Sequence, residues 1–416
     1  MDKKIRRIAV DLTPLLPGGE NGGAKLMTIE LIRNLSRIAA DCKFLLLTSE
    51  KNHEELAFLD SGNVRRILVS GGKGKFFKIR KGLRPLLAIL PAPVKIKLKS
   101  LYFFIACMVQ GKNHFSRLKT DLLFCPFTAP FFHASNMPTV SVIYDLQFFH
   151  YPQFFTFEER CERDRHFKEA CRLASRLICI SNYVREAVLK QAEISSDRVH
   201  AVYIRLSSRL PEKTSQKSEE ILARLNLAAY SFLLYPANFW EHKNHRMLLT
   251  AFGIYLARNP KSDMKLLCTG HPCLHMEALE NAAKGMKLDE RVVFPGYLST
   301  EEYAVLLRSC KAVIYPSLYE GFGMPIVEAM AYGKPVLCSN VTSLPEVAGD
   351  AALYFDPKRP QTIVEAISIL EKDEKLVAQL VERGRQRAAQ FSSAEQMARE
   401  YWKVFLEAAS FTERAT

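Results

Sequence analysis

The chain has 416 residues, of which 48% are hydrophobic and 25% are charged. This length predicts two domains of about 200 residues each, and this composition excludes an intrinsically disordered protein. The formal net charge is +14, and the excess lies in the first half: residues 1–205 hold 33 Lys and Arg against 19 Asp and Glu, whereas residues 206–416 hold 25 of each.

Short apolar runs without polar alternation recur along the chain and predict buried parallel strands. In the first half they cover residues 5–11, 44–48, 66–69, 122–125, 140–144 and 177–180, and in the second half 232–235, 265–269, 291–294, 312–315 and 335–339. Amphipathic segments predict helices over 24–38, 157–174, 245–257, 301–309 and 361–371, and a closing helical segment over 392–408. Strands that alternate with helices indicate an α/β protein with sheets covered on both faces.

A polar, charged stretch that begins at Pro211 interrupts this series. It predicts an inter-domain linker over residues 206–228. The sequence thus divides into a first domain over residues 1–205, a second domain over 229–391 and a C-terminal helical segment over 392–416, which we expect to pack back on the first domain. The longest nearly uncharged apolar run, residues 101–110, is about half as long as a membrane-spanning helix.

Two glycine-rich loops follow predicted strands, the position where ligands bind in such sheets. One loop, over residues 13–25, contains Gly22 and Gly23, and the other, over 316–325, contains Glu320. Pro325 favours the first turn of a helix that carries Glu328. Two carboxylates beside a positive helix end suit a ligand with phosphates and vicinal hydroxyls. The alternative from the chemistry alone is a helix cap at Glu320 and a solvated Glu328.

The segment from Glu320 to Glu328, Glu-Gly-Phe-Gly-Met-Pro-Ile-Val-Glu, resembles the Glu-x7-Glu motif of the retaining glycosyltransferases of family 4. The resemblance continues through residues 329–336 and 343–357. It implies the glycosyltransferase-B fold, in which two doubly wound Rossmann-like domains face a central cleft. The first domain, 1–205, is then the acceptor side, and the second, 229–391, binds the nucleotide-sugar.

The resemblance also assigns roles in the second domain. The first glutamate of the motif contacts the transferred sugar in that family, which implies a catalytic Glu320, and the second holds the ribose hydroxyls, which implies a donor-binding Glu328. The backbone amides of Phe322, Gly323 and Met324 are expected to meet the sugar or the phosphates.

The segment over residues 235–245 resembles the phosphate-binding segment of the family, which commonly carries an arginine and then a lysine. Lys243 matches the lysine and is expected to hold the donor's pyrophosphate as a catalytic and donor-binding cation. Asn238 stands where the arginine is usual, so His242, His245 or Arg246 are candidates for additional phosphate contacts.

The first domain contributes fewer site residues. Gly22 and Gly23 match the glycine-rich segment that faces the donor phosphates in the family, although a simple turn is the alternative. Tyr144 and Asp145 follow a predicted strand where many relatives place His-Asp, and they are expected near the acceptor or the sugar.

The implied activity is that of a retaining hexosyltransferase, which moves a hexose from a nucleoside-diphosphate sugar to a glycan or lipid-linked acceptor in cell-envelope polysaccharide synthesis. Residues 146–155 resemble those of bacterial polysaccharide mannosyltransferases, which favours mannose. The chain has no Asp-x-Asp triplet, so no metal and no cofactor are expected.

Residues 61–120 contain 14 Lys and Arg and no acidic residue, interleaved with aromatic side chains. This pattern favours an anionic membrane surface as a partner and a peripheral enzyme at the cytoplasmic face of the plasma membrane. A solvated basic face is the alternative. Nucleic acid is not expected, because no nucleic-acid-binding motif is present.

The same residues bear on other functions. A P-loop NTPase is excluded, because Leu26 occupies the position that needs Ser or Thr. A sugar-nucleotide epimerase or a phosphorylase of the same fold and a non-catalytic, membrane-associated partner remain alternatives.

Overall fold

The protein divides into two compact units. The computed structural model describes residues 4–18, 22–70, 118–134, 136–206, 210–211, 218–271 and 274–411. The first unit comprises Met1–Ile180, Val184–Val202 and Ala394–Thr416, and the second comprises Ser181–Tyr183 and Tyr203–Ser393.

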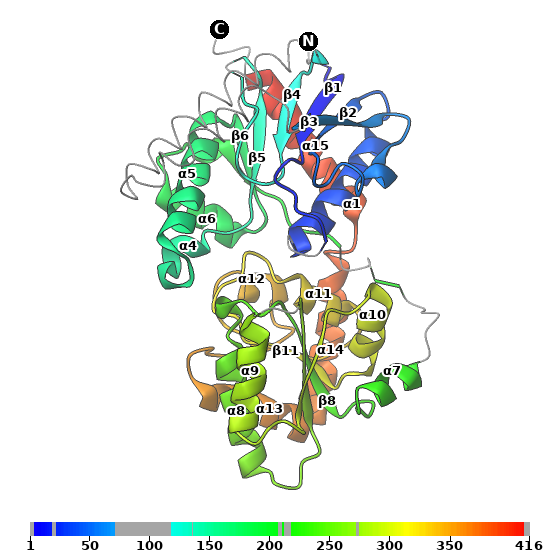
Figure 1. Ribbon diagram of the computed structural model, residues 1–416, viewed down its shortest axis with the longest axis vertical. Coiled ribbons are helices and arrows are strands. Elements are labelled where there is room, and N and C mark those ends of the chain that lie inside the picture. Colours follow the sequence, from blue (N-terminus) through cyan, green and yellow to red (C-terminus); the bar gives the residue numbers. More distant parts are fainter. Residues whose placement is uncertain are drawn as a thin grey trace. The chain divides into compact units, whose positions relative to one another are not determined.

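The first unit contains one parallel sheet of seven strands in the order β3-β2-β1-β4-β5-β6-β7 (Figure 1). The strands are β1 (Arg7–Asp11), β2 (Lys43–Ser49), β3 (Val64–Ser70), β4 (Leu122–Cys125), β5 (Thr139–Ile143), β6 (Arg176–Cys179) and β7 (Val199–Ala201). The helices are α1 (Gly22–Ile38), α4 (Gln147–His150), α5 (Phe157–Leu173), α6 (Asn182–Gln191) and α15 (Ala394–Phe411). Every residue of β4 and β5 is buried, as expected for strands that are covered on both faces.

The second unit contains a parallel sheet of six strands in the order β10-β9-β8-β11-β12-β13. The strands are β8 (Phe232–Pro236), β9 (Lys265–Thr269), β10 (Val292–Gly296), β11 (Ala312–Tyr315), β12 (Val336–Ser339) and β13 (Leu353–Phe355). The helices are α7 (Ser218–Arg224), α8 (His245–Arg258), α9 (Leu274–Gly285), α10 (Thr300–Ser309), α11 (Met324–Ala331), α12 (Leu344–Ala348), α13 (Pro360–Lys372) and α14 (Glu374–Ala389). Helix α8 packs on α13, and α11 packs on α14.

The structure confirms the predicted α/β class. All eleven predicted strands are present, with ends that differ by at most two residues, and the predicted helices correspond to α1, α5, α8, α10, α13 and α15. The sequence prediction missed β7 and β13. Both strands have only three residues, which is too short for an apolar run to stand out.

The last helix, α15, belongs to the first unit. It packs along α1, and the Tyr401 hydroxyl lies 4.0 Å from the sulfur of Met27. The ring centroid of Phe405 lies 5.0 Å from that of Phe124 on β4. Contacts between residues so far apart in the sequence show that the C-terminal helix completes the first core.

The unit boundary lies at Tyr203, ahead of the predicted linker over residues 206–228. Part of that segment is helical: α7 packs on α10, with Ile221 and Leu222 buried. Arg224 also pairs with Glu302 on α10. The prediction of a linker over this whole range was therefore wrong, because a short amphipathic helix within it joins the core of the second unit.

Local sequence signals explain where several helices begin. Helix α5 starts with a capping box in which Thr156 accepts from the Glu159 N–H while Glu159 accepts from the Thr156 N–H. Ser299 and Glu302 form the same motif before α10. Such reciprocal bonds satisfy backbone donors that a helix end leaves unpaired. Among the helices in the described ranges, none is both long and apolar enough to cross a membrane.

Asp11, the last residue of β1, is a buried acid in the first core. Only 1% of its surface is exposed, and its Oδ1 accepts from the N–H and the hydroxyl of Thr13, at 3.0 and 2.6 Å. Its Oδ2 has no hydrogen-bond partner among the described residues. Burial raises the pKa of Asp11 from 3.8 to about 7, against the opposing effect of the two hydrogen bonds from Thr13.

This shift predicts a pH dependence of stability. Because the folded protein holds the Asp11 proton more tightly than the unfolded chain, stability is greatest below about pH 4 and falls as the pH rises to about 7. A change in pKa from 3.8 to about 7 corresponds to about 4 kcal/mol at ~1.36 kcal/mol per pH unit. We therefore expect Asp11→Asn, which keeps both bonds from Thr13, to be more stable than wild type at pH 8 in chemical denaturation.

Asp60 supplies a control of opposite sign. Burial is the largest single influence and raises its pKa, but the hydrogen bonds and charge of Arg66 together outweigh burial and lower the pKa, so Asp60→Asn should be less stable than wild type at pH 8. An Asp11→Asn variant that loses as much stability between pH 5 and pH 8 as wild type would exclude Asp11 as the source.

Candidate functional site

The strand order of the second sheet changes direction between β8 and β11. In open parallel sheets, ligands bind beyond the carboxyl ends of the strands at such a switch point. The loop after β8 carries Lys243, and the loop after β11 carries Glu320. The topology thus brings together two residues that lie 77 positions apart in the sequence.

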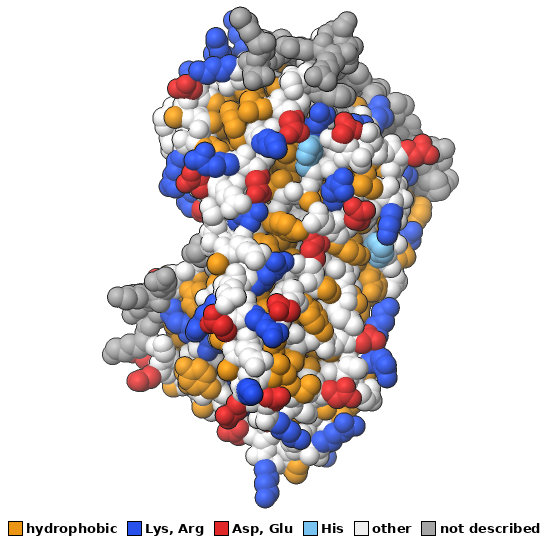
Figure 2. Space-filling model, turned by 180° about the vertical axis from the view of Figure 1, so that it is seen from behind, with side chains coloured by type: hydrophobic (Ala, Val, Ile, Leu, Met, Phe, Trp, Pro, Cys, Tyr) orange, Lys and Arg blue, Asp and Glu red, His pale blue; other side chains and the backbone are white. Residues whose placement is uncertain are grey.

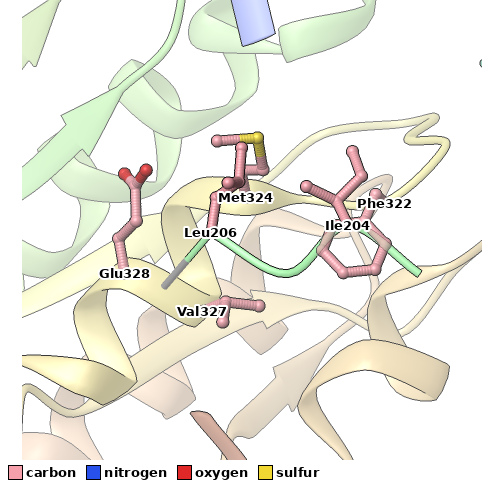
Figure 3. Close-up of a pocket in the computed structure, with 6 residues that line it drawn as sticks. All are labelled: Ile204, Leu206, Phe322, Met324, Val327 and Glu328. Atoms are coloured by element: carbon pink, nitrogen blue, oxygen red, sulfur yellow. The ribbon is translucent and has the colours of Figure 1, made fainter. Parts of the chain in front are cut away.

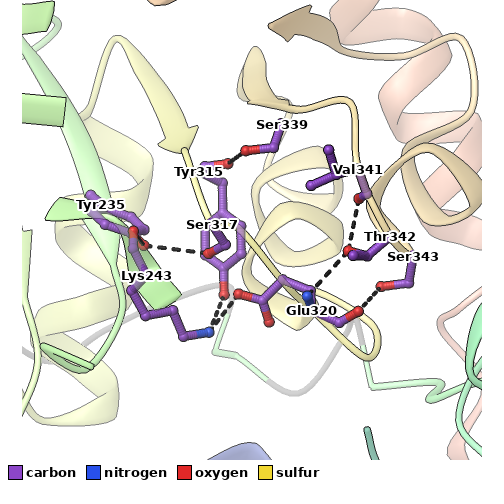
Figure 4. Close-up of polar contacts among 9 residues, drawn as sticks. All are labelled: Tyr235, Lys243, Tyr315, Ser317, Glu320, Ser339, Val341, Thr342 and Ser343. Carbon is purple, nitrogen blue, oxygen red and sulfur yellow. Dashed lines mark hydrogen bonds and ion pairs between the residues drawn. The ribbon is translucent and has the colours of Figure 1, made fainter. Parts of the chain in front are cut away.

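Lys243 and Glu320 form an ion pair with 2.6 Å between Nζ and Oε1 (Figure 4). Each side chain is only 10% exposed. The Lys243 ammonium also donates to the Tyr315 hydroxyl at 3.2 Å, and burial together with the nearby Glu320 raises the pKa of Tyr315. The two buried charges therefore neutralise one another. An anionic ligand that binds the Lys243 ammonium must share it with the Glu320 carboxylate.

The backbone around Lys243 is held by contacts from both loops. Asn244, at the start of α8, has the left-handed φ of +63°, a conformation that Asn tolerates. Its Nδ2 donates to the carbonyl of Pro316 at 3.1 Å and to that of Pro357 at 2.8 Å. The Tyr235 hydroxyl donates to the Lys243 carbonyl at 2.5 Å. Lys243 thus extends from a rigid turn that is tied to the loop after β11.

Glu328 lies on α11 and is 2% exposed. Its Oε2 accepts from the Tyr303 hydroxyl on α10 at 3.0 Å. The alternative of a solvated Glu328 was therefore wrong, because its side chain is buried and bonded to Tyr303. A buried carboxylate is costly unless it is hydrogen-bonded, and the Tyr303 hydroxyl supplies one such bond.

The turn before α11 carries the backbone amides that were expected to meet the sugar or the phosphates. Gly323 has φ +96°, and a Cβ there would lie 2.6 Å from the Leu344 side chain, so only glycine suits this position. Among the described residues no acceptor takes the N–H groups of Phe322, Gly323 and Met324. Consecutive unpaired amides at a helix N-terminus bind anions.

The side chains of Phe322 and Met324 serve the core instead. They line a small apolar recess with Ile204, Leu206 and Val327 (Figure 3). The carboxylate of Glu328, which borders the same recess, points away from Val327.

His245, one of the three candidates for an additional phosphate contact, is a buried core residue. The residue is 4% exposed, and its ring lies 4.6 Å from that of Tyr235 and 5.0 Å from that of Phe239 between centroids. Burial, and to a lesser extent the charge of Lys243, lowers the pKa of His245 to about 3. A neutral core imidazole supplies no cation to a phosphate.

Asn238 belongs to the same edge of the sheet. Its Oδ1 accepts from the His271 N–H at 3.0 Å, which ties the loop after β8 to the loop after β9. In the described second unit it therefore acts as a link between loops. Within the described ranges, no three His, Cys, Asp or Glu side chains gather as metal ligands would.

The predicted residues of the first unit follow two of its strands, β1 and β5. Gly22, with φ +51°, and Gly23 form the first turn of α1 rather than a loop, and residues 19–21 lie outside the described residues. Lys25 donates to the Gly18 carbonyl at 2.9 Å and to Glu55 at 2.6 Å. This lysine thus anchors the loop after β1.

Tyr144 and Asp145 follow β5. The Tyr144 hydroxyl lies 3.5 Å from that of Thr28 on α1, and burial raises its pKa. Asp145 accepts from the Gln147 N–H at 3.1 Å and so initiates α4. Both side chains make local contacts within the first unit.

The sequence did not reveal four residues that contact the candidate site residues. Tyr303, Tyr315, Thr342 and Ser343 all contact Lys243, Glu320 or Glu328. Thr342 and Ser343 follow the carboxyl end of β12, a signal that the sequence offered. Tyr303 lies within α10 and follows no strand directly, so only its hydrogen bond to Glu328 in the folded structure reveals it.

Residues 218–387 match the family model of glycosyl transferases group 1. This stretch contains Lys243, Glu320 and Glu328. It is a glycosyl transferases group 1 domain. The match confirms the glycosyltransferase resemblance predicted for the second half of the chain.

A curated relative extends the likeness. O-antigen chain mannosyltransferase B of Escherichia coli is 28% identical over 253 residues. The aligned stretch covers 61% of this chain and 66% of that relative, slightly less than two thirds of its length.

Two crystal structures resemble the whole chain. A glycosyltransferase from Rickettsia africae ESF-5 has a TM-score of 0.70 at 16% identity, covering 98% of this chain and 99% of that one. Anabaena HepE in complex with UDP and glucose has a TM-score of 0.68 at 17% identity, covering 97% and 99%. Likeness at these identities establishes the fold alone: two doubly wound α/β units of the glycosyltransferase-B type, as predicted.

Proposed function

We propose that this protein is a retaining hexosyltransferase that transfers a sugar from a nucleoside diphosphate to a glycan or lipid-linked acceptor of the cell envelope. The observation that carries the proposal is the nearly buried Lys243–Glu320 pair at the switch point of the second sheet. A group 1 domain surrounds this pair, and the names of the relatives support sugar transfer.

The chemistry follows from the charges. A donor diphosphate competes with Glu320 for the Lys243 ammonium and accepts hydrogen bonds from the amides before α11. Glu320, released from part of its pairing, then accepts hydrogen bonds from the transferred sugar, while Glu328 accepts from the ribose hydroxyls. As the glycosidic bond breaks, Lys243 and the amides stabilise the charge that develops on the leaving diphosphate.

Retention of the anomeric configuration and the preference for mannose belong to the same proposal. The leaving phosphate takes the acceptor's proton on the face that it departs from, so the protein orients the two substrates and needs no nucleophile of its own. GDP-mannose is the preferred donor, which the mannosyltransferase relative supports.

The first test measures donor binding and turnover. GDP-mannose should raise the melting temperature more than UDP-, ADP- or dTDP-sugars do, because a ligand stabilises the state that binds it. Glu328→Gln should weaken nucleotide binding at least tenfold, whereas Glu320→Gln should lower kcat by a similar factor. These expectations follow from the loss of about 1–3 kcal/mol per hydrogen bond to a charged group, and a coupled assay of nucleotide release measures both.

Glu371 supplies a matched control. Like Glu320, Glu371 contacts a lysine and a tyrosine, here Lys311 and Tyr255. Glu371 lies on α13, and Lys311 directly precedes β11, at the amino ends of the strands and away from the candidate site. Glu371→Gln should alter stability without altering donor affinity. Wild-type kinetics for both site variants would refute the site, donor turnover without acceptor would indicate an epimerase, and no turnover at all would indicate a non-catalytic partner.

A second expectation concerns metals. Because Lys243 and backbone dipoles are proposed to hold the diphosphate, transfer should survive chelation with EDTA within a factor of about two. Loss of activity that magnesium or manganese restores would contradict this account of the leaving group.

Membrane association at the cytoplasmic leaflet is a further part of the proposal. It rests on the acid-free basic stretch over residues 61–120, most of which lies outside the described residues. On the face shown in Figure 2, Lys and Arg side chains are interspersed with Asp and Glu.

Vesicle binding tests this association. Each Lys or Arg near an anionic surface contributes about 1 kcal/mol, and salt screens the attraction. Binding to anionic vesicles should therefore fall with salt, and fall again in the variant with five substitutions to Gln, at Lys73, Lys75, Lys78, Arg80 and Lys81.

A control with the same loss of charge replaces five exposed residues of the second unit: Arg258, Lys261, Lys284, Lys372 and Lys375. It should bind vesicles as wild type does. Equal binding to neutral and anionic vesicles, or none to either, would leave a solvated basic face and a soluble acceptor.

A further inference from the structure

The loop after β12 contains a strained residue beside the candidate site. Thr342 has φ +58°, in the left-handed region. Among the described non-glycine residues with positive φ, only Thr342 and Thr128 are β-branched, and a β-branched side chain is strongly disfavoured in this conformation. Backbone strain of this kind persists only where the surrounding structure imposes it, and it concentrates at functional sites.

The Thr342 hydroxyl makes two hydrogen bonds, one in each direction (Figure 4). Its oxygen accepts from the Glu320 N–H at 3.1 Å, and its hydrogen is donated to the Val341 carbonyl at 2.8 Å. A hydroxyl can fill both roles at once because it has one hydrogen and two lone pairs. The donated bond fixes the rotamer, so the lone pair stays directed at Glu320.

The next residue fixes the other end of the Glu320 backbone. The Ser343 hydroxyl donates to the Glu320 carbonyl at 2.9 Å, and Ser343 is fully buried. Two consecutive hydroxyls therefore hold the N–H and the C=O of Glu320. Neither contact involves Lys243, so this support persists when an anionic ligand draws Lys243 away from the carboxylate.

Glycine would adopt the left-handed backbone at position 342 without strain. A glycine has no hydroxyl, however, and would leave the Glu320 N–H without this acceptor. Threonine at this position therefore supplies a hydroxyl that glycine lacks, although its backbone is strained.

We propose that Thr342 is a positioning residue for Glu320: its strained backbone places a hydroxyl that fixes the Glu320 carboxylate at the sugar to be transferred. This inference rests on the proposed function of Glu320. Small displacements of a catalytic group cost large factors in rate, so the loss of this support should appear in kcat more than in donor affinity.

Three substitutions separate the hydroxyl from the backbone. Thr342→Gly removes the hydroxyl and the strain, Thr342→Val removes the hydroxyl and keeps the β-branch, and Thr342→Ser keeps the hydroxyl and removes the branch. We expect kcat to fall at least fivefold in the Gly and Val variants and to stay within about twofold in the Ser variant. Donor KM should change by less than about twofold in all three.

Stability should follow a different order. The melting temperature of Thr342→Gly should equal or exceed that of wild type, because the strain is relieved, whereas that of Thr342→Val should fall. A residue with only a structural role would lose stability and activity together. Lys287→Gly is the matched control: Lys287 has φ +57° after α9, and glycine there should raise stability and leave kcat unchanged.

The outcomes are distinguishable. A wild-type kcat in Thr342→Gly, or equal losses of kcat in the Gly and Ser variants, would overturn the inference. The proposed function would stand in that case, provided that the wild-type protein transfers sugar. Failure of the wild-type protein to transfer sugar from any donor would overturn both.

Discussion

The ion pair between Lys243 and Glu320 is the interaction on which the candidate site depends. At 10% exposure each charge has lost most of its water, and a buried charge without a partner is strongly destabilising. The pair is held by groups that do not depend on it: Asn244 and Tyr235 hold the backbone of Lys243, and the loop after β12 holds that of Glu320. A ligand can therefore replace one partner of the pair while the other stays in position.

Parallel sheet topology explains why these residues meet. Every contributor follows the carboxyl end of a strand, Lys243 after β8, Glu320 after β11 and Thr342 after β12, and adjacent parallel strands end at one edge. The first unit has the same architecture with different chemistry. At its switch point β1 ends in Asp11, an acid buried beside Thr13. The two units thus carry different polar groups beyond the switch points of their sheets.

Burial near helix starts is a feature that the local sequence did not reveal. His245 and Glu328 both lie near the start of a helix, where a polar side chain is usually solvated, yet both are buried. His245 is covered by the rings of Tyr235 and Phe239, and Glu328 by Tyr303. The contact of Glu328 with Tyr303 joins separate helices, and the stacking of His245 on Tyr235 and Phe239 depends on how the loop after β8 folds. The same holds for the segment over 206–228, where α7 joins the core through α10.

The sequence by itself determined the class of fold and the chemistry of the second unit. Apolar runs mark buried strands because parallel strands are covered on both faces, and the spacing of Glu320, Gly323, Pro325 and Glu328 depends only on local backbone geometry. Only the tertiary structure decided the pairing of Glu320 with Lys243, the hydroxyl support from Thr342 and the contact of Glu328 with Tyr303. These contacts join residues that are distant in the chain, so they follow from strand order and packing, which no local pattern encodes.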